Sequence, residues 1–70
     1  MTLDQLRVFV AVAERQHLTE GAKAAHLSPS AATAAIQALE ARHGAKLFHR
    51  VGRGLELSEI GRAFLPQAQS

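Results

Sequence analysis

The sequence lacks the features that link many small proteins covalently or through a metal. It has 70 residues and no cysteine, which excludes disulfides and cysteine–zinc sites. It has no tryptophan or tyrosine, three phenylalanines and two prolines. A chain of this length forms one small domain, and without such links it depends on regular helix packing. Because 14 of the residues are alanine, the best helix former, the composition favours a mainly α fold.

Long hydrophobic runs are also missing. The longest covers residues 8–13, far short of the roughly 20 residues that span a bilayer, so we expect no membrane contact. Asp4 stands where a signal peptide carries positive charge, which argues against a secretion signal. The four histidines show no metal-ligand spacing, and no glycine-rich phosphate loop follows a predicted strand. We therefore expect neither an enzyme nor a metal site.

The formal net charge of +2 is unevenly distributed along the chain. Residues 42–53 contain four lysines and arginines and no acid, whereas the segments before and after each carry a net charge of −1. Such a cluster fits contacts to phosphates of a nucleic acid. The alternative interpretation is an ordinary solvated loop.

Three sites look like helix N-termini. Thr2 with Gln5 forms a capping-box pattern, Thr19 is the expected N-cap of a short helix to about His26, and Ser28-Pro29 suits the start of a third helix. That third helix is expected to run over residues 29–43 and to end at Gly44. Three helices with a short connection between the second and third are typical of a helix-turn-helix.

Helical spacing also predicts the core. The first helix has an apolar stripe, made of Leu3, Leu6, Phe9, Val10 and Ala13. Val8 and Val12 lie off this stripe and are expected to face a second element, such as the C-terminal helix. Gly21 allows another helix to approach closely, and His43 is expected to be half-buried at the end of its helix.

Beyond Gly44 the pattern changes to short strands. Residues 46–50 and 55–57 are predicted to pair across a glycine-containing turn at 51–54, which makes a β-wing. Ser58 is the expected cap of a last helix, and Pro66 should kink or interrupt that helix. Because this helix has barely begun at residue 70, we expect it to continue in a longer parent protein.

The chain resembles the N-terminal DNA-binding domain of LysR-type transcriptional regulators. The matching motifs follow one another over about 60 residues: Leu3-x-x-Leu6-x-x-Phe9-x-x-Val12-Ala13-Glu14, Thr19-x-x-Ala22, Leu27-Ser28, Ala31-x-x-x-x-Ile36-x-x-Leu39-Glu40-x-x-x-Gly44, Leu47-Phe48-x-Arg50 and Leu55-x-Leu57-Ser58-x-x-Gly61. The resemblance implies a winged helix-turn-helix over residues 1–58. It also implies the start of a linker, or dimerisation, helix over 59–70, with the effector-binding domain of the family absent.

The resemblance further implies that helix 29–43 enters the major groove and that wing 46–57 lies on the flanking backbone or minor groove. The candidate DNA-binding residues are Ser28, Ser30, Thr33, Ala34, Gln37, Lys46, Arg50 and Arg53, and the candidate dimerisation residues are Ile60, Ala63 and Phe64. Many family members have arginine at the position of Ala34, so a larger share of binding is expected from the wing, the helix N-terminus and DNA shape. Two residues have alternative roles: Ser28 as an N-cap and Arg50 as an anchor of the wing to the domain.

The family also implies partners. These are a dyad-symmetric promoter element of double-stranded DNA and a homodimer formed through the linker helix, with a higher oligomer in the full-length protein. No cofactor is expected in this fragment, and a small-molecule effector is implied for the missing C-terminal domain. The expected location is the cytoplasm, with the nucleoid. The alternatives are a winged-helix domain of another bacterial regulator family, or a helical protein-interaction or dimerisation module.

Overall fold

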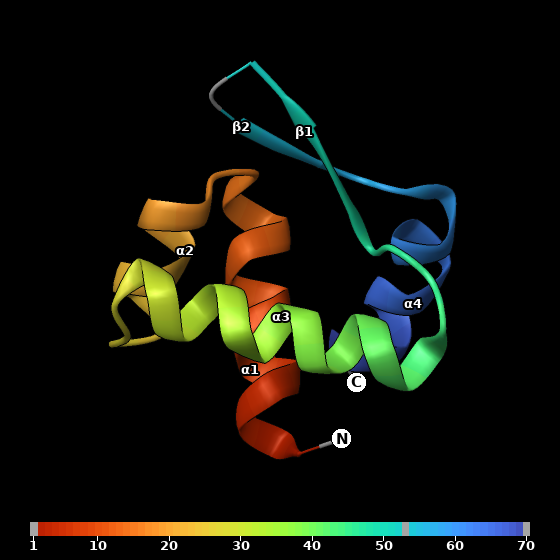
Figure 1. Ribbon diagram of the computed structural model, residues 1–70, viewed down its shortest axis with the longest axis horizontal. Helices are drawn as coiled ribbons and strands as arrows, with labels where there is room; N and C mark the ends of the chain where they lie inside the picture. The colour runs from red at the N-terminus through yellow and green to blue at the C-terminus, as the bar shows by residue number, and fades with distance from the viewer. Residues whose placement is uncertain (1, 53, 70) are drawn as a thin grey trace.

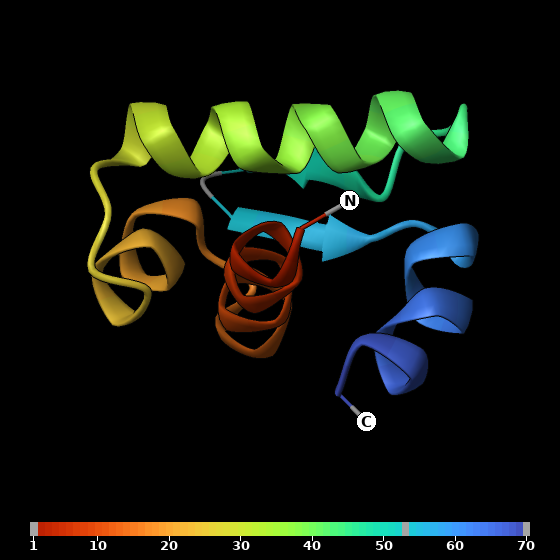
Figure 2. The same ribbon diagram turned by 90° about the horizontal axis from the view of Figure 1, so that it is seen from below.

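The computed structural model describes residues 2–52 and 54–69. Its elements in chain order are α1 (Leu3–Arg15), α2 (Leu18–Ala24), α3 (Pro29–His43), β1 (Phe48–Val51), β2 (Gly54–Leu57) and α4 (Glu59–Gln69). Helix α3 crosses in front of α1, and the β1–β2 hairpin projects from one side of the helices (Figure 1). In the perpendicular view α3 forms one outer layer, with α1, α2 and α4 on its other side (Figure 2). The predicted mainly helical, winged architecture is confirmed.

The caps of α1 and α3 are those the sequence predicts. Thr2 and Gln5 form both hydrogen bonds of the capping box. The Ser28 hydroxyl accepts a hydrogen bond from the Ala31 amide at 3.2 Å, with Pro29 at the first helical position. Gly44 follows α3 in the left-handed region, at φ 67°. These caps fix both ends of α3.

The predicted cap of α2 is wrong. His17, not Thr19, is the N-cap, and its Nδ1 accepts a hydrogen bond from the Glu20 amide at 3.2 Å. The helix therefore begins at Leu18 and ends at Ala24, two residues before the expected end at His26. An imidazole nitrogen can replace the hydroxyl oxygen of a usual cap because both offer a lone pair to the free amides of the first turn.

Replacing this cap has a measurable cost. His17→Ala is expected to lower the free energy of unfolding by about 1 kcal/mol, because one amide of the first turn of α2 loses its acceptor. His17→Asn keeps a side-chain acceptor at the N-cap, so it is expected to stay close to the original stability. Urea unfolding of the two variants checks this, and equal losses in both would show that the hydrogen bond to Glu20 contributes nothing.

The core lies where α1, α2, α3 and the root of the wing meet. Its buried hydrophobic residues are Val8, Phe9, Val12, Ala13, Ala22, Ala25, Ala32, Ile36, Leu39, Leu47 and Phe48. The expectation that Leu3 belongs to this core is wrong, since its side chain is 82% exposed. The first turn of α1 extends beyond the crossing with α3, so no element of the described chain covers it there (Figure 1). Helical periodicity predicts the direction in which a side chain points, but it does not predict whether a neighbouring helix extends far enough to cover that side chain.

Val12 faces α2 rather than the C-terminal helix. A Cβ built on Gly21 would lie 2.5 Å from the Val12 Cα, which confirms the prediction that Gly21 permits a close helix approach. Helix α4 contacts α1 elsewhere. The Phe64 ring lies 5.2 Å from that of Phe9, and the Gln69 amide donates to the Glu14 carboxylate at 3.3 Å.

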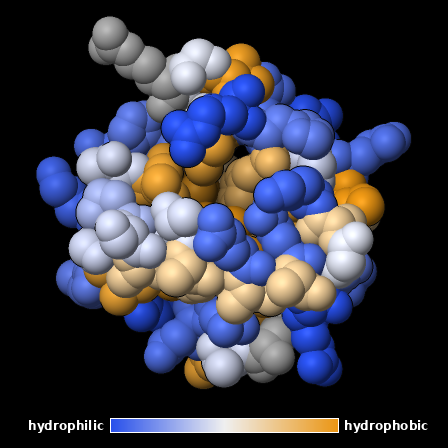
Figure 3. Space-filling model, viewed as in Figure 1, coloured by the Kyte–Doolittle hydropathy of each residue, from blue (hydrophilic) through white to orange (hydrophobic). Residues whose placement is uncertain are grey.

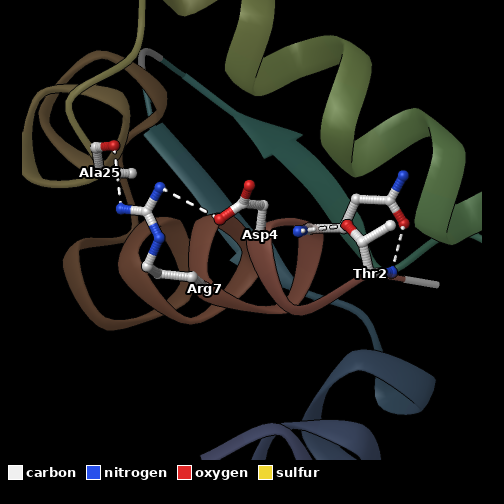
Figure 4. Close-up of polar contacts among 5 residues, drawn as sticks. Thr2, Asp4, Arg7 and Ala25 are labelled. Carbon is white, nitrogen blue, oxygen red and sulfur yellow. Dashed lines mark hydrogen bonds and ion pairs between the residues drawn. The ribbon is translucent and has the colours of Figure 1, made fainter.

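A polar contact from α1 holds the connection between α2 and α3. The Arg7 guanidinium donates to the Ala25 carbonyl at 3.0 Å and lies 3.7 Å from the Asp4 carboxylate (Figure 4). His26 follows in the left-handed region at φ 61°. The contact from Arg7 ties the turn of the helix-turn-helix to α1, which fixes the point from which α3 starts.

The wing is an antiparallel pair with Phe48 opposite Leu57 and Val51 opposite Gly54. The first strand begins and ends later in the chain than the predicted 46–50, because residues 46 and 47 bond to other elements. The Leu55 amide donates to the Gln16 carbonyl at 3.0 Å, and a Cβ on Gly54 would also lie 3.0 Å from that oxygen. The start of β2, which directly follows the turn of the hairpin, is thus joined to Gln16 at the end of α1.

Ser58 caps α4 as predicted, since its hydroxyl accepts from the Gly61 amide at 2.9 Å. Of the two effects predicted for Pro66, a kink or an interruption, the interruption is wrong, because α4 continues through Pro66 to Gln69. A proline near the end removes one hydrogen bond, while contacts of α4 with α1 hold the helix on both sides of it. Among residues 2–52 and 54–69, no helix has both the length and the apolar character needed to cross a membrane.

Candidate nucleic-acid interface

One long side of α3 is open to solvent. Ser28, Ser30, Ala34 and Gln37 are exposed, and Thr33 is half-buried. Residues 28–39 contain no charged side chain, so this surface offers hydroxyls, one amide and methyl groups. Its solvent-facing position in Figure 2 leaves α3 free to enter a groove.

A cleft of about 340 Å³ separates α3 from the wing. Thr33 and Gln37 line it from α3, and Lys46, His49 and Arg50 line it from the wing side. Apolar side chains complete the lining: Leu18, Ile36, Phe48 and Leu55. The space-filling view shows this hollow between the alanine-rich ridge of α3 and the hairpin (Figure 3). The structure thus brings polar groups of α3 opposite cations of the wing.

The structure separates the predicted DNA-binding residues into groups. Thr33, Gln37, Lys46 and Arg50 lie together around the cleft. The other three described candidates, Ser28, Ser30 and Ala34, lie on the exposed surface of α3. Arg53 lies outside the described residues.

The cations of the cleft differ in their partners. Lys46 Nζ lies 3.9 Å from the Glu40 Oε1, so part of its charge is neutralised within the domain. Within the described part of the chain, the Arg50 guanidinium forms no hydrogen bond or ion pair. Arg50 is exposed on β1, which leaves it available to an anion and gives no polar contact for the alternative role of wing anchor.

Two cleft residues were missed as site candidates. His49 belongs to the basic segment and lies beside Arg50 on the cleft. Glu40 belongs to α3, and its side chain is only 12% exposed. The one signal for Glu40 was its position three residues after Gln37, which places both on the same side of a helix.

The candidate dimerisation residues do not form one free surface. Ile60 is 50% exposed and Ala63 is exposed, but Phe64 is half-buried. The ring of Phe64 packs against Phe9 and lies 4.5 Å from the His43 ring. The expectation that His43 is half-buried is wrong, since the residue is exposed apart from this ring contact. Ile60 and Ala63 therefore remain available to a partner, whereas Phe64 joins α4 to the domain.

Comparison with known proteins identifies the family. Residues 3–62 match the family described as "Bacterial regulatory helix-turn-helix protein, lysR family". The chain belongs to the LysR family. It is 46% identical over 69 residues to the HTH-type transcriptional regulator TfdT of Cupriavidus pinatubonensis, a match that covers 99% of the chain and 30% of TfdT. The chain thus spans less than a third of the length of that relative.

Solved structures of the family resemble this LysR domain closely. The domain superposes on the "CbnR_DBD-DNA complex" with a TM-score of 0.93 and 43% identity, over 99% of this chain and 79% of that one. It superposes on the "BenM_DBD/benA site 1 DNA Complex" with a TM-score of 0.91 and 33% identity, over 99% and 78%. Both neighbours are complexes with DNA, and the curated relative is a transcriptional regulator rather than an enzyme. In residues 2–52 and 54–69, no three His, Asp or Glu side chains are placed to hold a metal ion.

Proposed function

We propose that this chain is the sequence-specific DNA-binding domain of a LysR-type transcriptional regulator, with α3 in the major groove and the wing on the flanking backbone or minor groove. The observation that carries the proposal is the cleft, which Thr33 and Gln37 line together with Arg50, a cation with no partner among the described residues. Base-reading groups and a phosphate-binding cation are then presented side by side, as contact with one face of a duplex requires. The close likeness to DNA complexes supports this assignment.

The polar residues of α3 have distinct proposed roles. Gln37 is suited to the paired donor and acceptor of adenine in the major groove, and Ser30 and Thr33 to various bases or phosphates. The N-terminus of α3, capped by Ser28, favours a phosphate because its free amides and dipole attract an anion. Ala34 supplies a methyl group where many family members have arginine. On the wing side, Lys46, Arg50 and Arg53 are the proposed phosphate contacts.

The proposed partners follow from the family. We infer a homodimer in which α4 continues as the linker helix, with Ile60 and Ala63 toward the second copy, and a higher oligomer in the complete protein. The two copies would read a dyad-symmetric promoter element in the bacterial cytoplasm, where the nucleoid lies. A small-molecule effector would bind the C-terminal effector-binding domain that the family implies for the complete protein.

Selection from a pool of random duplexes tests the proposed function. We expect the 70-residue chain to enrich a defined sequence, which then serves as the selected duplex in the experiments below. A shuffled duplex of the same base composition provides the control. Equal binding to both duplexes, or none to either, contradicts sequence-specific recognition.

Arg50 provides a test of the phosphate contact. Arg50→Ala is expected to weaken binding to the selected and shuffled duplexes by the same factor, because phosphates carry no sequence information. The slope of log K against log salt concentration should become shallower by about 0.9, the value for one lost phosphate contact. Arg62→Ala is the matched control, since Arg62 is exposed on α4 and pairs with Glu56 at 3.8 Å. An unchanged slope in Arg50→Ala would remove Arg50 from the interface.

A further inference from the structure

Glu40 is an unusual residue for a surface that is to meet a polyanion. It is the only acidic residue of α3, and it lines the cleft with Gln37 and Arg50. A carboxylate facing phosphates repels them unless other groups neutralise or occupy it. The Glu40 side chain is only 12% exposed, so groups of the domain itself must contact its carboxylate.

The carboxylate of Glu40 holds the two residues that precede the wing. Its Oε2 accepts a hydrogen bond from the Leu47 amide at 2.9 Å, and its Oε1 lies 3.9 Å from the Lys46 Nζ. Leu47 is fully buried, and β1 begins at the next residue. The bond to Leu47 therefore fixes the start of the wing relative to α3.

The same two residues are held from the other side by the beginning of α4. The Ser58 hydroxyl donates to the Lys46 carbonyl at 2.7 Å, and the Ser58 amide donates to the Leu47 carbonyl at 2.9 Å. Residues 46–47, which we call the wing root, thus lie between Glu40 and Ser58. Ser58, at the start of α4, binds the two carbonyls of the wing root. On the other side, the Glu40 carboxylate binds its Leu47 amide and so connects it to α3.

We propose that Glu40 is a positioning residue for DNA binding: by accepting the Leu47 amide, it sets the distance between Gln37 of α3 and Arg50 of the wing. The role rests on the proposed function, because it matters only if both walls of the cleft contact the same duplex. The Lys46 ammonium, 3.9 Å from Oε1, offsets part of the negative charge that Glu40 brings to this position. Lys46 thus has two roles in this proposal: its ammonium lies close to Glu40 within the domain, and it also contacts a DNA phosphate.

Two substitutions separate geometry from charge. Glu40→Gln removes the charge but keeps an oxygen that can accept the Leu47 amide. Glu40→Asp keeps the charge but is one methylene shorter, so it does not reach that amide. The exposed glutamate at the start of α4 supplies the control, Glu59→Asp.

Binding of each variant to the selected and the shuffled duplex is measured at a temperature where circular dichroism shows it folded. We expect Glu40→Gln to keep the ratio of the affinities for the selected and shuffled duplexes within about threefold of the original. Glu40→Asp is expected to lower this ratio about tenfold, which corresponds to the loss of one hydrogen bond to a charged group. Glu59→Asp should leave the ratio unchanged. The Leu47 amide should exchange with deuterium slowly in the original chain and in Glu40→Gln, and faster in Glu40→Asp.

Other outcomes overturn the proposal. If Glu40→Asp keeps the ratio and Glu40→Gln changes it, the charge matters and the position does not. If both variants lose stability but keep the ratio, Glu40 is structural only. An original chain that binds both duplexes equally contradicts the proposed function itself, which is distinct from a loss of preference confined to Glu40→Asp.

Discussion

Gly21→Ala is expected to lower the free energy of unfolding by about 2 kcal/mol or more. The added methyl carbon would lie 2.5 Å from the Val12 Cα and 2.9 Å from its backbone nitrogen, so α1 and α2 would have to separate. Alanine improves helix propensity by about 1 kcal/mol over glycine, but the overpacking costs about 3 kcal/mol or more at a contact between two backbones. A single core of this size contributes only about 3–5 kcal/mol of stability, so a net loss of about 2 kcal/mol or more removes much of it.

Thermal unfolding followed by circular dichroism measures this loss. Two further variants identify its cause. Val12→Ala combined with Gly21→Ala removes the Val12 Cγ2, 2.6 Å from the new methyl, but not the backbone atoms, so it should restore little. Gly44→Ala adds a methyl in open space at φ 67° and is expected to cost only about 1 kcal/mol. A Gly21→Ala domain as stable as the original would show that α1 and α2 do not approach as described.

Gly61→Ala is expected to have the second largest effect, and a different one. A Cβ at Gly61 would overlap the Leu47 carbonyl oxygen and lie 3.0 Å from a Leu57 methyl, so α4 would move away from the wing root. We expect a loss of about 2–3 kcal/mol in the free energy of unfolding, since the overlap is with backbone that cannot rotate away. The hydrogen bonds from Ser58 to Lys46 and Leu47 would weaken with it.

Urea unfolding gives the size of this effect, and amide exchange gives its location. The Ser58 and Gly61 amides, which donate to Leu47 and to the Ser58 hydroxyl, should exchange faster in Gly61→Ala. The amides of α2 should exchange as before when conditions keep the variant folded. Ala63→Gly provides a comparison, since it lowers the helix propensity of α4 by about 1 kcal/mol without a new contact. Faster exchange throughout the domain would mean that α4 is not coupled locally to the wing root.

Much of the fold could be predicted because its signals are local. Ser28-Pro29 and Gly44 mark α3 through the chemistry of its ends, and the glycine-containing turn marks the wing. The errors occur where the outcome depends on a partner distant in sequence. Leu3 follows the periodicity of α1 but no helix covers it, and Val12 faces α2 because Gly21 leaves room there. His17 was missed because Thr19 is the more usual cap.

The candidate site was predictable in part for the same reason. The basic segment and the uncharged face of α3 are visible in the sequence, and they identify Gln37 and Arg50 separately. Their position on opposite walls of one cleft depends on the whole fold. The role of Glu40 depends on a hydrogen bond to Leu47 across the loop after α3. No spacing pattern in a single sequence predicts such a bond.

The most direct test of the central claim, that α3 reads bases, is the affinity of Gln37→Ala for the selected and shuffled duplexes over a range of salt concentrations. We expect binding to the selected duplex to fall about tenfold or more, the loss of one base-specific pair of hydrogen bonds. Binding to the shuffled duplex and the salt slope should stay unchanged, because Gln37 carries no charge. Equal loss on both duplexes, or an unchanged preference for the selected one, would contradict the assignment of α3 as the helix that reads the sequence.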